Sequence, residues 1–496
     1  MEKKRILQIF QLTALSVQLL AEILTSVVVL QLKMLPNKYV AVFIGGMVAL
    51  LMGSCLFMLI KVKGGIADWR MIASGALALL LVCGCGVISK LALDAHDFLG
   101  SVTDDDSGAR STYILVQNED DARSLTDTEA YRFGAVENYD VEHTQKMLDS
   151  VKEATGKPVE LVYYPQASQL VDAFYRKEVD ALLMNGASIS LLIENDGYQD
   201  FLSDVRVLHT MTHEKDDDSD GKLLGELTKT PFVVYISGSD TRSQKLTVSR
   251  SDVNILAVVN PKTKQILLVN TPRDYYVPNP AGKNALDKLT HCGNYGVDCS
   301  IEVLETLYNI EIDRYAKINF TGFQELIDAI GGITIYSDTA FLAHGKTQIQ
   351  KGENKLNGEQ LLDFTRERDK VIGGDNGRGK NQMKVIKAVV EKLTSSKTLI
   401  SNYAEILKSL EGMLATDMTG DEISSLVKMQ LNDMASWDVQ SFAVTGLSDY
   451  QETYSVPGLK LFVYWPKEDS IAHANKLIQR MLNGDVLSAT DMTVSG

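Results

Sequence analysis

The segment from Asn357 to Gln382 concentrates side chains that could bind phosphate. It holds Arg366, Arg368 and Arg378 around a glycine-rich turn, and Gln382 follows Arg378 by four residues. A planar guanidinium binds phosphate through two parallel hydrogen bonds, so a cluster of arginines is more informative than any one of them. The alternative is a solvated loop in which the arginines pair with neighbouring acids. The residues alone leave both interpretations open.

Local signals predict how the backbone presents these side chains. Asn357 can cap a helix, and Gln360 completes an Asx variant of the capping box. If that helix ends near Phe364 and the chain then runs extended, Arg366 and Arg368 share one face about 7 Å apart. That spacing suits the two phosphates of a pyrophosphate.

A glycine-rich turn and a second helix are expected to complete this candidate site. Residues 373–377 read Gly-Gly-Asp-Asn-Gly, which permits a backbone nest whose N–H groups attract anions. Arg378 and Gln382 are four residues apart, so a helix would present both on one face.

Composition constrains the ligands that such a site could serve. The chain of 496 residues has a formal net charge of −15 and a pI near 5.0. Such an acidic protein is poorly suited to a broad nucleic-acid surface, so no nucleic-acid partner is expected. The arginine cluster is then a local positive island, as a small anionic ligand requires. The length predicts several domains.

Residues 1–93 are predicted to form a membrane region. The apolar runs Ile6–Leu32, Tyr39–Lys61 and Met71–Leu93 each exceed the roughly 20 residues needed to cross a bilayer. Basic residues precede the first run and separate the second from the third, whereas acids follow the third. The positive-inside rule therefore predicts a multi-pass cell-membrane protein with a cytoplasmic N-terminus and everything after Leu93 outside. Glu22 is expected to be a bundle-facing acid with a structural role.

Composition shifts divide the rest of the chain. In order, we expect an acidic linker at 94–110, an accessory α/β domain at 111–213, a charged linker at 214–229, a larger α/β domain with a C-terminal extension at 230–483, and a loose tail at 484–496. In the accessory domain, buried runs alternate with amphipathic stretches, which predicts a small parallel or mixed sheet with crossover helices. Those helices are expected at Val141–Ala154, Ala167–Arg176 and Ser188–Glu194.

Charged residues gather at predicted strand ends early in the larger domain. A β-hairpin is expected over residues 253–270, and sites in α/β sheets form where strand ends face a crevice. Two carboxylates there suit Mg²⁺, which takes one or two protein carboxylates plus phosphate oxygens. Taken singly, each Asp–Arg pair is better explained as a salt bridge. The set comprises Asp240, Arg242, Arg250, Asp252, Arg273 and Asp274.

Six motifs in this order resemble those of the LytR–CpsA–Psr family: GSDTR, SRSD, VNTPRD, DKLTH, LNGEQLLDFTRERD and GGDNGRGKNQ. The resemblance covers roughly Thr230–Lys392 and is strongest to capsule-associated members, which carry an accessory domain between membrane spans and catalytic domain. It implies three transmembrane helices, a small α/β domain and an αβα-type catalytic domain with a central mixed sheet. Such proteins are membrane-anchored enzymes that move a glycopolymer from a polyprenyl-pyrophosphate carrier to peptidoglycan.

The resemblance also implies roles for individual residues. The catalytic clamp would be Arg273, Arg366, Arg368 and Arg378. Further pyrophosphate contacts would come from Arg242, Arg250, Lys288 and Gln382. Mg²⁺ would be held by Asp240 and Asp252. The polyprenyl chain would occupy an apolar tunnel lined by Phe320, Phe323, Ile327 and Ile330, although the same residues would equally form an ordinary core-facing helical stripe.

The expected function is therefore a Mg²⁺-assisted phosphotransferase that attaches capsular polysaccharide, or a related glycopolymer, to peptidoglycan. Expected partners are the lipid-linked polysaccharide, peptidoglycan, membrane lipid and other capsule-assembly membrane proteins. Two alternatives remain: a membrane-bound regulator of capsule or wall genes, and a polyprenyl-pyrophosphate pyrophosphatase without transfer. The predicted cytoplasmic segments are too short for a known DNA-binding module, which weighs against the regulator.

The cysteines divide by location. Cys292 and Cys299 lie in a polar region that is predicted to be outside the membrane, so a disulfide between them is expected. The other three lie in apolar runs and are expected to be small buried hydrophobes.

Overall fold

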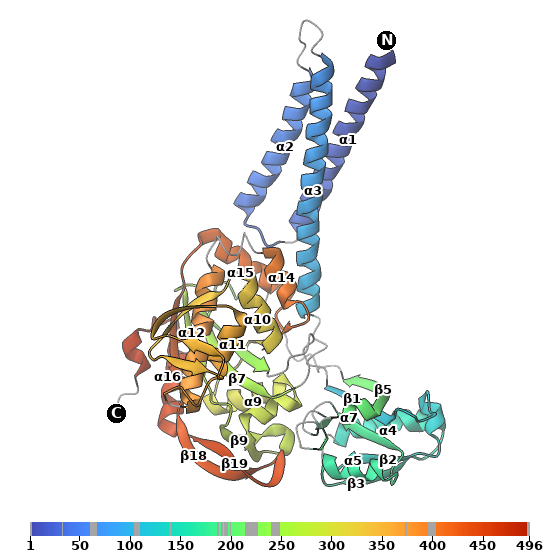
Figure 1. The fold of residues 1–496 in the computed structure, drawn as a ribbon, viewed down its shortest axis with the longest axis vertical. Helices are drawn as coiled ribbons and strands as arrows, with labels where there is room; N and C mark the ends of the chain where they lie inside the picture. Colours follow the sequence, from blue (N-terminus) through green and yellow to red (C-terminus); the bar gives the residue numbers. More distant parts are fainter. Residues whose placement is uncertain are drawn as a thin grey trace.

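The computed structural model describes residues 2–31, 33–59, 67–103, 110–137, 141–185, 188–189, 192, 197–198, 200–213, 227–239, 249–372, 374–394 and 403–493. Figure 1 shows three long helices at one end of the molecule, a larger α/β part beneath them and a smaller α/β part beside it. This arrangement agrees with the fold class that the sequence predicts.

The three long helices are α1 (Glu2–Gln31), α2 (Asn37–Leu59) and α3 (Ala67–Thr103). Each contains a run long and apolar enough to cross a membrane, namely Leu12–Gln31, Asn37–Leu56 and Ala73–Ala95. The predicted spans are therefore confirmed as three apolar helices of sufficient length, while their insertion and orientation in a membrane stay predictions. Helix α3 continues past its apolar run, so most of the described part of the expected linker is helical.

Polar residues of the first span face the other helices. The Gln18 side-chain amide donates to Glu22 Oε1 over 2.8 Å, and both residues are buried. Thr25 Oγ1 lies 2.9 Å from Ser89 Oγ of α3. A buried polar group is costly unless it is hydrogen-bonded, and these contacts meet that need. The bundle-facing position predicted for Glu22 is confirmed.

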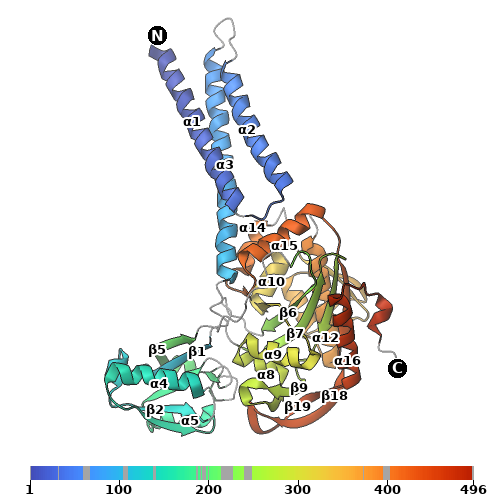
Figure 2. The ribbon, with the colours of Figure 1, turned by 180° about the vertical axis from the view of Figure 1, so that it is seen from behind.

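The base of the helices is attached to the larger α/β part. Helix α3 packs against α14 (Tyr403–Leu410), α15 (Gly420–Asp433) and β16 (Leu414–Thr416), as Figure 2 shows for the two helices. The loop before α2 is held on α15 by a hydrogen bond from Lys33 Nζ to Asp421 Oδ1 (3.1 Å). The first turn of α2 is held there by bonds from Lys38 Nζ to the Asn432 carbonyl (2.6 Å) and from Lys428 Nζ to Asn37 Oδ1 (3.2 Å).

The accessory part is a five-stranded mixed sheet in the order β3-β2-β4-β1-β5. Strand β2 runs parallel to β3 and β4, whereas β1 is antiparallel to β4 and β5. Helices α4 and α5 cover opposite faces, because alternate strand residues such as Ile114 and Leu115 enter different clusters. The elements are β1 (Arg110–Gln117), β2 (Arg132–Val136), α4 (Val141–Thr155), β3 (Glu160–Tyr164), α5 (Ala167–Tyr175), β4 (Ala181–Asn185), α7 (Phe201–Asp204) and β5 (Val205–His213).

The mixed sheet and the first two crossover helices of this part are confirmed. Strand β2 was not expected from the sequence. The third expected helix, Ser188–Glu194, falls largely outside the described residues.

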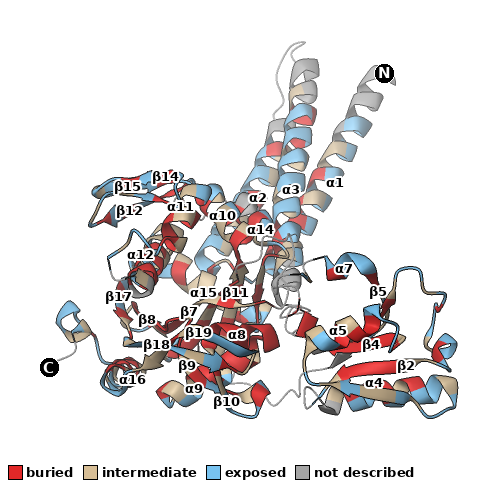
Figure 3. Ribbon diagram, turned by 60° about the horizontal axis from the view of Figure 1, so that its bottom comes forward, coloured by how far each residue is buried: buried red, intermediate tan, exposed pale blue. Residues whose placement is uncertain are grey.

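The larger part is built on a six-stranded mixed sheet in the order β16-β11-β6-β7-β8-β17. Helices α9 and α16 pack on one face and α12 and α15 on the other, which gives the expected αβα layers. Figure 3 shows the buried residues gathered along these central strands. The elements are β6 (Phe232–Ser239), β7 (Ser251–Asn260), β8 (Gln265–Asn270), α9 (Val297–Tyr308), β11 (Arg314–Asn319), α12 (Gly374–Thr394), β17 (Asp438–Ala443) and α16 (Glu468–Leu482).

Smaller elements complete this part. Helices α10 and α11 share a second core with two short strand pairs, β12–β15 and β13–β14, while β9 pairs with β10 and β18 with β19. Their bounds are β9 (Tyr276–Asn279), β10 (Ala285–Lys288), α8 (Leu289–Cys292), α10 (Phe320–Ala329), β12 (Ile333–Ser337), β13 (Phe341–Ala343), β14 (Thr347–Ile349), β15 (Gly352–Leu356), α11 (Gly358–Arg366), β18 (Gly446–Thr453) and β19 (Val456–Pro466).

The described part of the segment that was expected to be a loose tail is attached to the larger part at two points, although most of its residues are exposed. Leu487 is 2% exposed, and its backbone N–H and carbonyl both bond the buried side chain of Gln265 over 2.8 Å. Arg480 Nη1 also lies 2.6 Å from Asp491 Oδ1. These contacts are distant in sequence, so local composition gave no sign of them.

Candidate functional site

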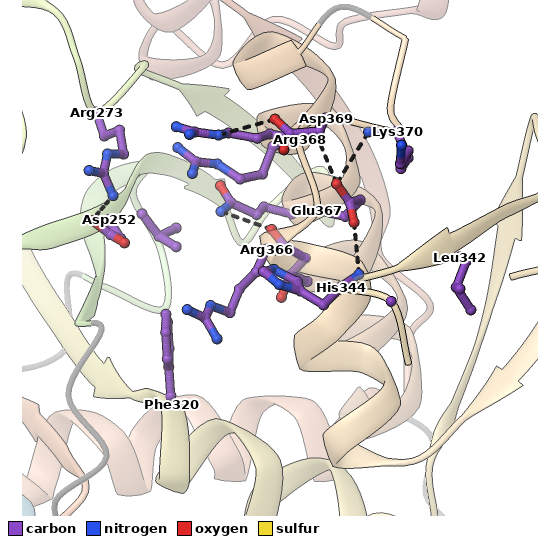
Figure 4. Close-up of a pocket in the computed structure, with 15 residues that line it drawn as sticks. Asp252, Arg273, Phe320, Leu342, His344, Arg366, Glu367, Arg368, Asp369 and Lys370 are labelled. Carbon is purple, nitrogen blue, oxygen red and sulfur yellow. Dashed lines mark hydrogen bonds and ion pairs between the residues drawn. The ribbon is translucent and has the colours of Figure 1, made fainter. Parts of the chain in front are cut away.

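A cavity of about 550 Å³ lies between the sheet and the end of α11. Figure 4 shows Asp252 and Arg273 on one side, Phe320 below, and the residues that follow α11 on the other side. These residues come from separate segments of the chain, so the fold is what brings them to one cavity. Of the predicted site residues, the cavity brings together Asp252, Arg273, Phe320, Arg366, Arg368, Arg378 and Gln382.

Helix α11 places the first arginine of the clamp. Asn357 Oδ1 accepts from the Gln360 backbone N–H (2.9 Å), and Gln360 Oε1 accepts from that of Asn357 (3.1 Å), so the predicted capping box is confirmed. The helix ends at Arg366, two residues later than expected, and Glu367 is extended with ψ of 127°. Phe364 faces the core, which leaves Arg366 on the cavity side.

Arg366 is oriented by an aromatic ring. Its guanidinium carbon lies 4.9 Å from the centroid of Phe320, the first residue of α10. A cation over a ring face gains about 0.5–1 kcal/mol at exposed sites and more when it is desolvated. Asn319 caps α10 by accepting from the Gly322 N–H over 2.8 Å, which fixes where Phe320 begins the helix. The ring therefore holds the guanidinium at the cavity wall (Figure 4).

The acids beside the clamp differ in what they contact. Arg368 and Asp369 are exposed and 3.5 Å apart, a surface ion pair of small energetic value. The Glu367 carboxylate is buried and accepts three backbone N–H groups, from His344 (2.8 Å), Asp369 (2.9 Å) and Lys370 (3.2 Å). Burial would raise the pKa of Glu367, but these N–H groups outweigh it and lower the pKa. The salt-bridged-loop alternative therefore describes the Arg368–Asp369 pair but not Glu367, whose carboxylate is bonded to the backbone.

Helix α12 carries two more of the predicted site residues, Arg378 and Gln382. Arg378 and Gln382 are both buried on its cavity side, which confirms the shared face predicted from their spacing. Gln382 Nε2 also donates to the Thr365 carbonyl over 3.4 Å and so joins α12 to α11. A Cβ at Gly379 would lie 2.2 Å from Asn270 Nδ2, so only glycine lets α12 approach the end of β8 this closely.

The glycine-rich stretch differs from the expected turn. Helix α12 already begins at Gly374, so residues 374–377 form its first turn, while Gly373 lies outside the described residues. A Cβ at Gly377 would lie 2.4 Å from the Ile372 carbonyl oxygen. Gly377 thus allows the preceding chain to pack closely on the helix.

An alternating series of charges forms the opposite wall. Arg273 Nη1 lies 2.5 Å from Asp252 Oδ1, which also accepts from Thr290 Oγ1 over 3.3 Å. Arg273 Nε is 3.8 Å from Asp274 Oδ1, and Lys288 Nζ donates to the same oxygen over 2.9 Å. Lys288 is not among the residues that line the cavity. The structure therefore places its ammonium behind Arg273, and its expected phosphate contact stays a prediction.

Three other residues predicted to contact phosphate or metal are not among the described residues that line the cavity. Asp240 and Arg242 lie outside the described residues. Arg250 is half-buried just before β7 and does not line the cavity. Within the described ranges, no group of three or more His, Cys, Asp or Glu side chains could hold a metal ion. Asp252 is thus the one described carboxylate of the predicted Mg²⁺ pair.

The lipid-tunnel residues of α10 have different surroundings. Phe320 lines the cavity, whereas Ile327 and Ile330 are almost fully buried in the second core, and Phe323 packs against it. The helical-stripe interpretation describes the last three, and their contact with lipid stays a prediction.

The structure corrects the expected disulfide. Cys292 and Cys299 are free thiols, both buried in the main core. A hydrogen bond between the two side chains and burial raise the pKa of the Cys292 thiol. Cys299 Sγ donates to Asn279 Oδ1 over 3.4 Å. The two cysteines therefore act as small core residues, because apolar neighbours surround them in spite of the polar sequence nearby.

Several cavity residues were not singled out from the sequence. They are Leu342, His344, Gly345, Thr365 and Lys370. Thr365 and Lys370 lie within the arginine segment and could have been found by extending it. The other three belong to the β13–β14 hairpin, and no local signal connects that hairpin to the arginines.

Comparison with known proteins supports a family assignment. A polyisoprenyl-teichoic acid–peptidoglycan teichoic acid transferase TagU from Enterococcus faecalis is 37% identical over 200 residues, which is 40% of this chain and 65% of that protein, just under two thirds. The protein of the same name from Bacillus mycoides is 33% identical over 221 residues, 44% of this chain and 71% of its own length.

Solved structures resemble the chain more distantly. The crystal structure of B. subtilis TagV has a TM-score of 0.43 at 24% identity, over 51% of this chain and 98% of that one. The crystal structure of B. subtilis TagU has a TM-score of 0.40 at 26% identity, over 52% of this chain and 100% of that one. Both scores are below 0.5, so the assignment rests on sequence. The LytR_cpsA_psr family model matches residues 202–467, just over half of the chain. The chain belongs to the LytR–CpsA–Psr family.

Proposed function

We propose that this protein is a phosphotransferase that moves a glycopolymer from a polyisoprenyl-pyrophosphate carrier to peptidoglycan. The observation that carries the proposal is the single cavity in which Arg273, Arg366, Arg368 and Arg378 converge with Gln382. Such a group suits the two phosphates of a pyrophosphate, since each guanidinium offers a planar pair of donors. The names of the two TagU relatives support the same substrate classes.

The proposed phosphoryl transfer follows from the positions of the arginine side chains. Arg273 approaches from the end of β8, opposite the arginines that follow α11 and begin α12. An acceptor hydroxyl of peptidoglycan attacks the phosphorus next to the sugar and gives up its proton to solvent as the new bond forms. The bond from that phosphorus to the bridging oxygen breaks, and polyisoprenyl phosphate leaves with the electron pair. The arginines position the donor and stabilise charge on the phosphoryl oxygens, which is the main contribution a protein makes to phosphoryl transfer.

Mg²⁺ is part of the proposal. Asp252, together with Asp240, would hold the ion against phosphate oxygens, a ligand set that Mg²⁺ accepts. The contacts of Asp252 support this: Arg273 and Thr290 both meet Oδ1 and orient the carboxylate at the cavity wall. When bound, the ion would neutralise the pyrophosphate and act as a Lewis acid.

The proposed polymer is a capsular polysaccharide. The support is the order of parts along the chain: three apolar helices, an accessory α/β domain, then the family domain. This is the order that the capsule-associated members have. In this arrangement the accessory and family domains lie outside the membrane, where peptidoglycan is available, and other capsule-assembly membrane proteins are proposed partners.

Incubation of the full-length protein with a lipid-linked oligosaccharide, with and without peptidoglycan, tests the proposal. A transferase links the saccharide to peptidoglycan and needs the acceptor. Release of saccharide phosphate regardless of acceptor would indicate a pyrophosphatase instead. No turnover of any donor would favour the regulator. Parallel donors carrying a capsular repeat or a teichoic acid separate the two polymers.

A further inference from the structure

Glu367 joins the arginine segment to the β13–β14 hairpin, which lies outside the six family motifs. It lies between Arg366 and Arg368 and is 6% exposed. Its Oε1 accepts from the backbone N–H groups of Asp369 (2.9 Å) and Lys370 (3.2 Å), and its Oε2 accepts from that of His344 (2.8 Å). Figure 4 shows these bonds running from one carboxylate to both segments. One side chain therefore closes the clamp loop and attaches it to another part of the chain.

His344 lies at the tip of the β13–β14 hairpin in a left-handed conformation, with φ of 46°. The conformation turns its backbone N–H towards Glu367. The following Gly345 has φ of 67°, and both residues line the cavity together with Leu342. The hairpin tip is therefore a wall of the cavity, and the Glu367 bond sets its distance from the arginines.

The two strands of the hairpin also contact α11. Thr347 Oγ1 donates to Asp363 Oδ2 over 2.7 Å. The Phe341 ring stacks on that of Phe364, with centroids 6.0 Å apart and planes at 23°. Thr347 directly follows the turn and Phe341 lies at the open end, so these two contacts hold the strands of the hairpin. The Glu367 carboxylate reaches from the arginine loop to the turn itself, where it accepts from the His344 N–H.

Three converging N–H donors explain why this residue is an acid. A carboxylate has two acceptor oxygens and no donor, so it can satisfy all three groups at once. Glutamine has one acceptor oxygen, and its NH₂ group would face a backbone N–H. A neutral substitute of nearly the same size therefore removes at least one of these bonds without opening a cavity.

We propose that Glu367 is a positioning residue that holds the hairpin tip and the Arg366–Arg368 segment as one rigid wall facing the pyrophosphate of the donor. This inference rests on the proposed function of the cavity. Glu367 acts through Arg368 and the tip, because its own oxygens are engaged by the backbone. Loss of these bonds lets both segments move relative to α12 and weakens donor binding, while the chemistry in the bound complex is little changed.

The test compares Glu367→Gln with the matched control Glu359→Gln, an exposed glutamate in the first turn of α11, the helix that precedes Glu367. In the full-length protein, the KM for the lipid-linked donor and the inhibition constant of inorganic pyrophosphate should each rise about tenfold, the effect of losing one charge-assisted contact, with kcat changed by less than about threefold. Hydrogen exchange of residues 341–349 should accelerate. The control should match the wild type in all of these measurements.

A second pair of variants separates the possible failures. Arg368→Ala should weaken pyrophosphate binding, and adding Glu367→Gln to it should weaken binding little further, since both changes affect one wall. If Arg368→Ala binds normally, the proposed function itself fails. If Arg368→Ala weakens binding while Glu367→Gln lowers only the melting temperature, the positioning role is overturned and the function stands.

Thr347→Val covers the case in which Glu367→Gln does not fold. It removes the hydrogen bond that joins the hairpin to Asp363 beside the turn, and it should raise the donor KM as Glu367→Gln does. An unchanged KM together with faster exchange of residues 341–349 would overturn the inference.

Discussion

Replacement of Arg366 by lysine tests how the clamp holds phosphate, because it keeps the charge and removes the guanidinium. Lysine loses the planar pair of donors, and a charge-assisted hydrogen bond contributes about 1.5–3 kcal/mol. It also loses the stacking of the guanidinium 4.9 Å above the Phe320 ring, which contributes about 0.5–1 kcal/mol. The total of about 2–4 kcal/mol corresponds to a fall in kcat/KM of roughly thirtyfold to a thousandfold.

Phe320→Leu isolates the ring from the guanidinium. It should lower kcat/KM only about twofold to fivefold, the equivalent of the stacking contribution alone. The assay is initial-rate turnover of a lipid-linked oligosaccharide by variants with matched melting temperatures. Wild-type kcat/KM in Arg366→Lys, or a loss in Phe320→Leu as large as that in Arg366→Lys, would refute this reasoning about the clamp.

The remaining predictions concern the metal, the helix packing and a buried ion pair. Asp252→Asn should abolish the Mg²⁺ dependence of turnover while the fold persists; a wild-type Mg²⁺ titration would contradict the metal proposal. Gly379→Ala should lower stability in urea by about 1–3 kcal/mol, because its Cβ meets Asn270; unchanged stability would show that α12 shifts freely. Glu422→Gln should cost about 2–3 kcal/mol, because it breaks the pair that Arg314 Nη2 makes with Glu422 Oε1 at 2.6 Å. Burial would raise the pKa of Glu422, but hydrogen bonds and the charge of Arg314 outweigh it and lower the pKa. The stabilisation is therefore present above the ordinary glutamate pKa and is lost as the pH falls through the lower folded value. A Glu422→Gln variant that unfolds in acid at the same pH as the wild type would contradict this.

Local signals in the sequence predicted much of the fold and part of the site. Asn357 and Gln360 are three residues apart and form the capping box that starts α11. Arg378 and Gln382 share a helix face as their spacing requires. The apolar runs became three helices long enough to span a membrane. Each of these features depends on residues that are neighbours within a single segment, so a pattern in the chain is sufficient to reveal it.

Contacts between distant segments account for what the sequence did not reveal. Glu367 looked like a salt-bridge partner of its neighbours, but its decisive bond is to His344, 23 residues away along the chain. Lys288 lies in a motif of the site, yet its ammonium pairs with Asp274 behind the cavity wall. Leu487 packs against Gln265, which no composition rule would connect to a C-terminal tail. These residues become neighbours only when the chain folds, so the sequence alone does not show that they are in contact.

Following the phosphorus atom tests the central claim most directly. A donor would carry radioactive phosphorus only in the phosphate next to the sugar, and it would be incubated with the full-length protein, Mg²⁺ and peptidoglycan. The proposed attack on that phosphorus predicts that the label becomes covalently attached to peptidoglycan with the saccharide, while unlabelled polyisoprenyl phosphate is released. Label that stays with the lipid, or that appears as free saccharide phosphate in the presence of acceptor, would contradict the proposed transfer.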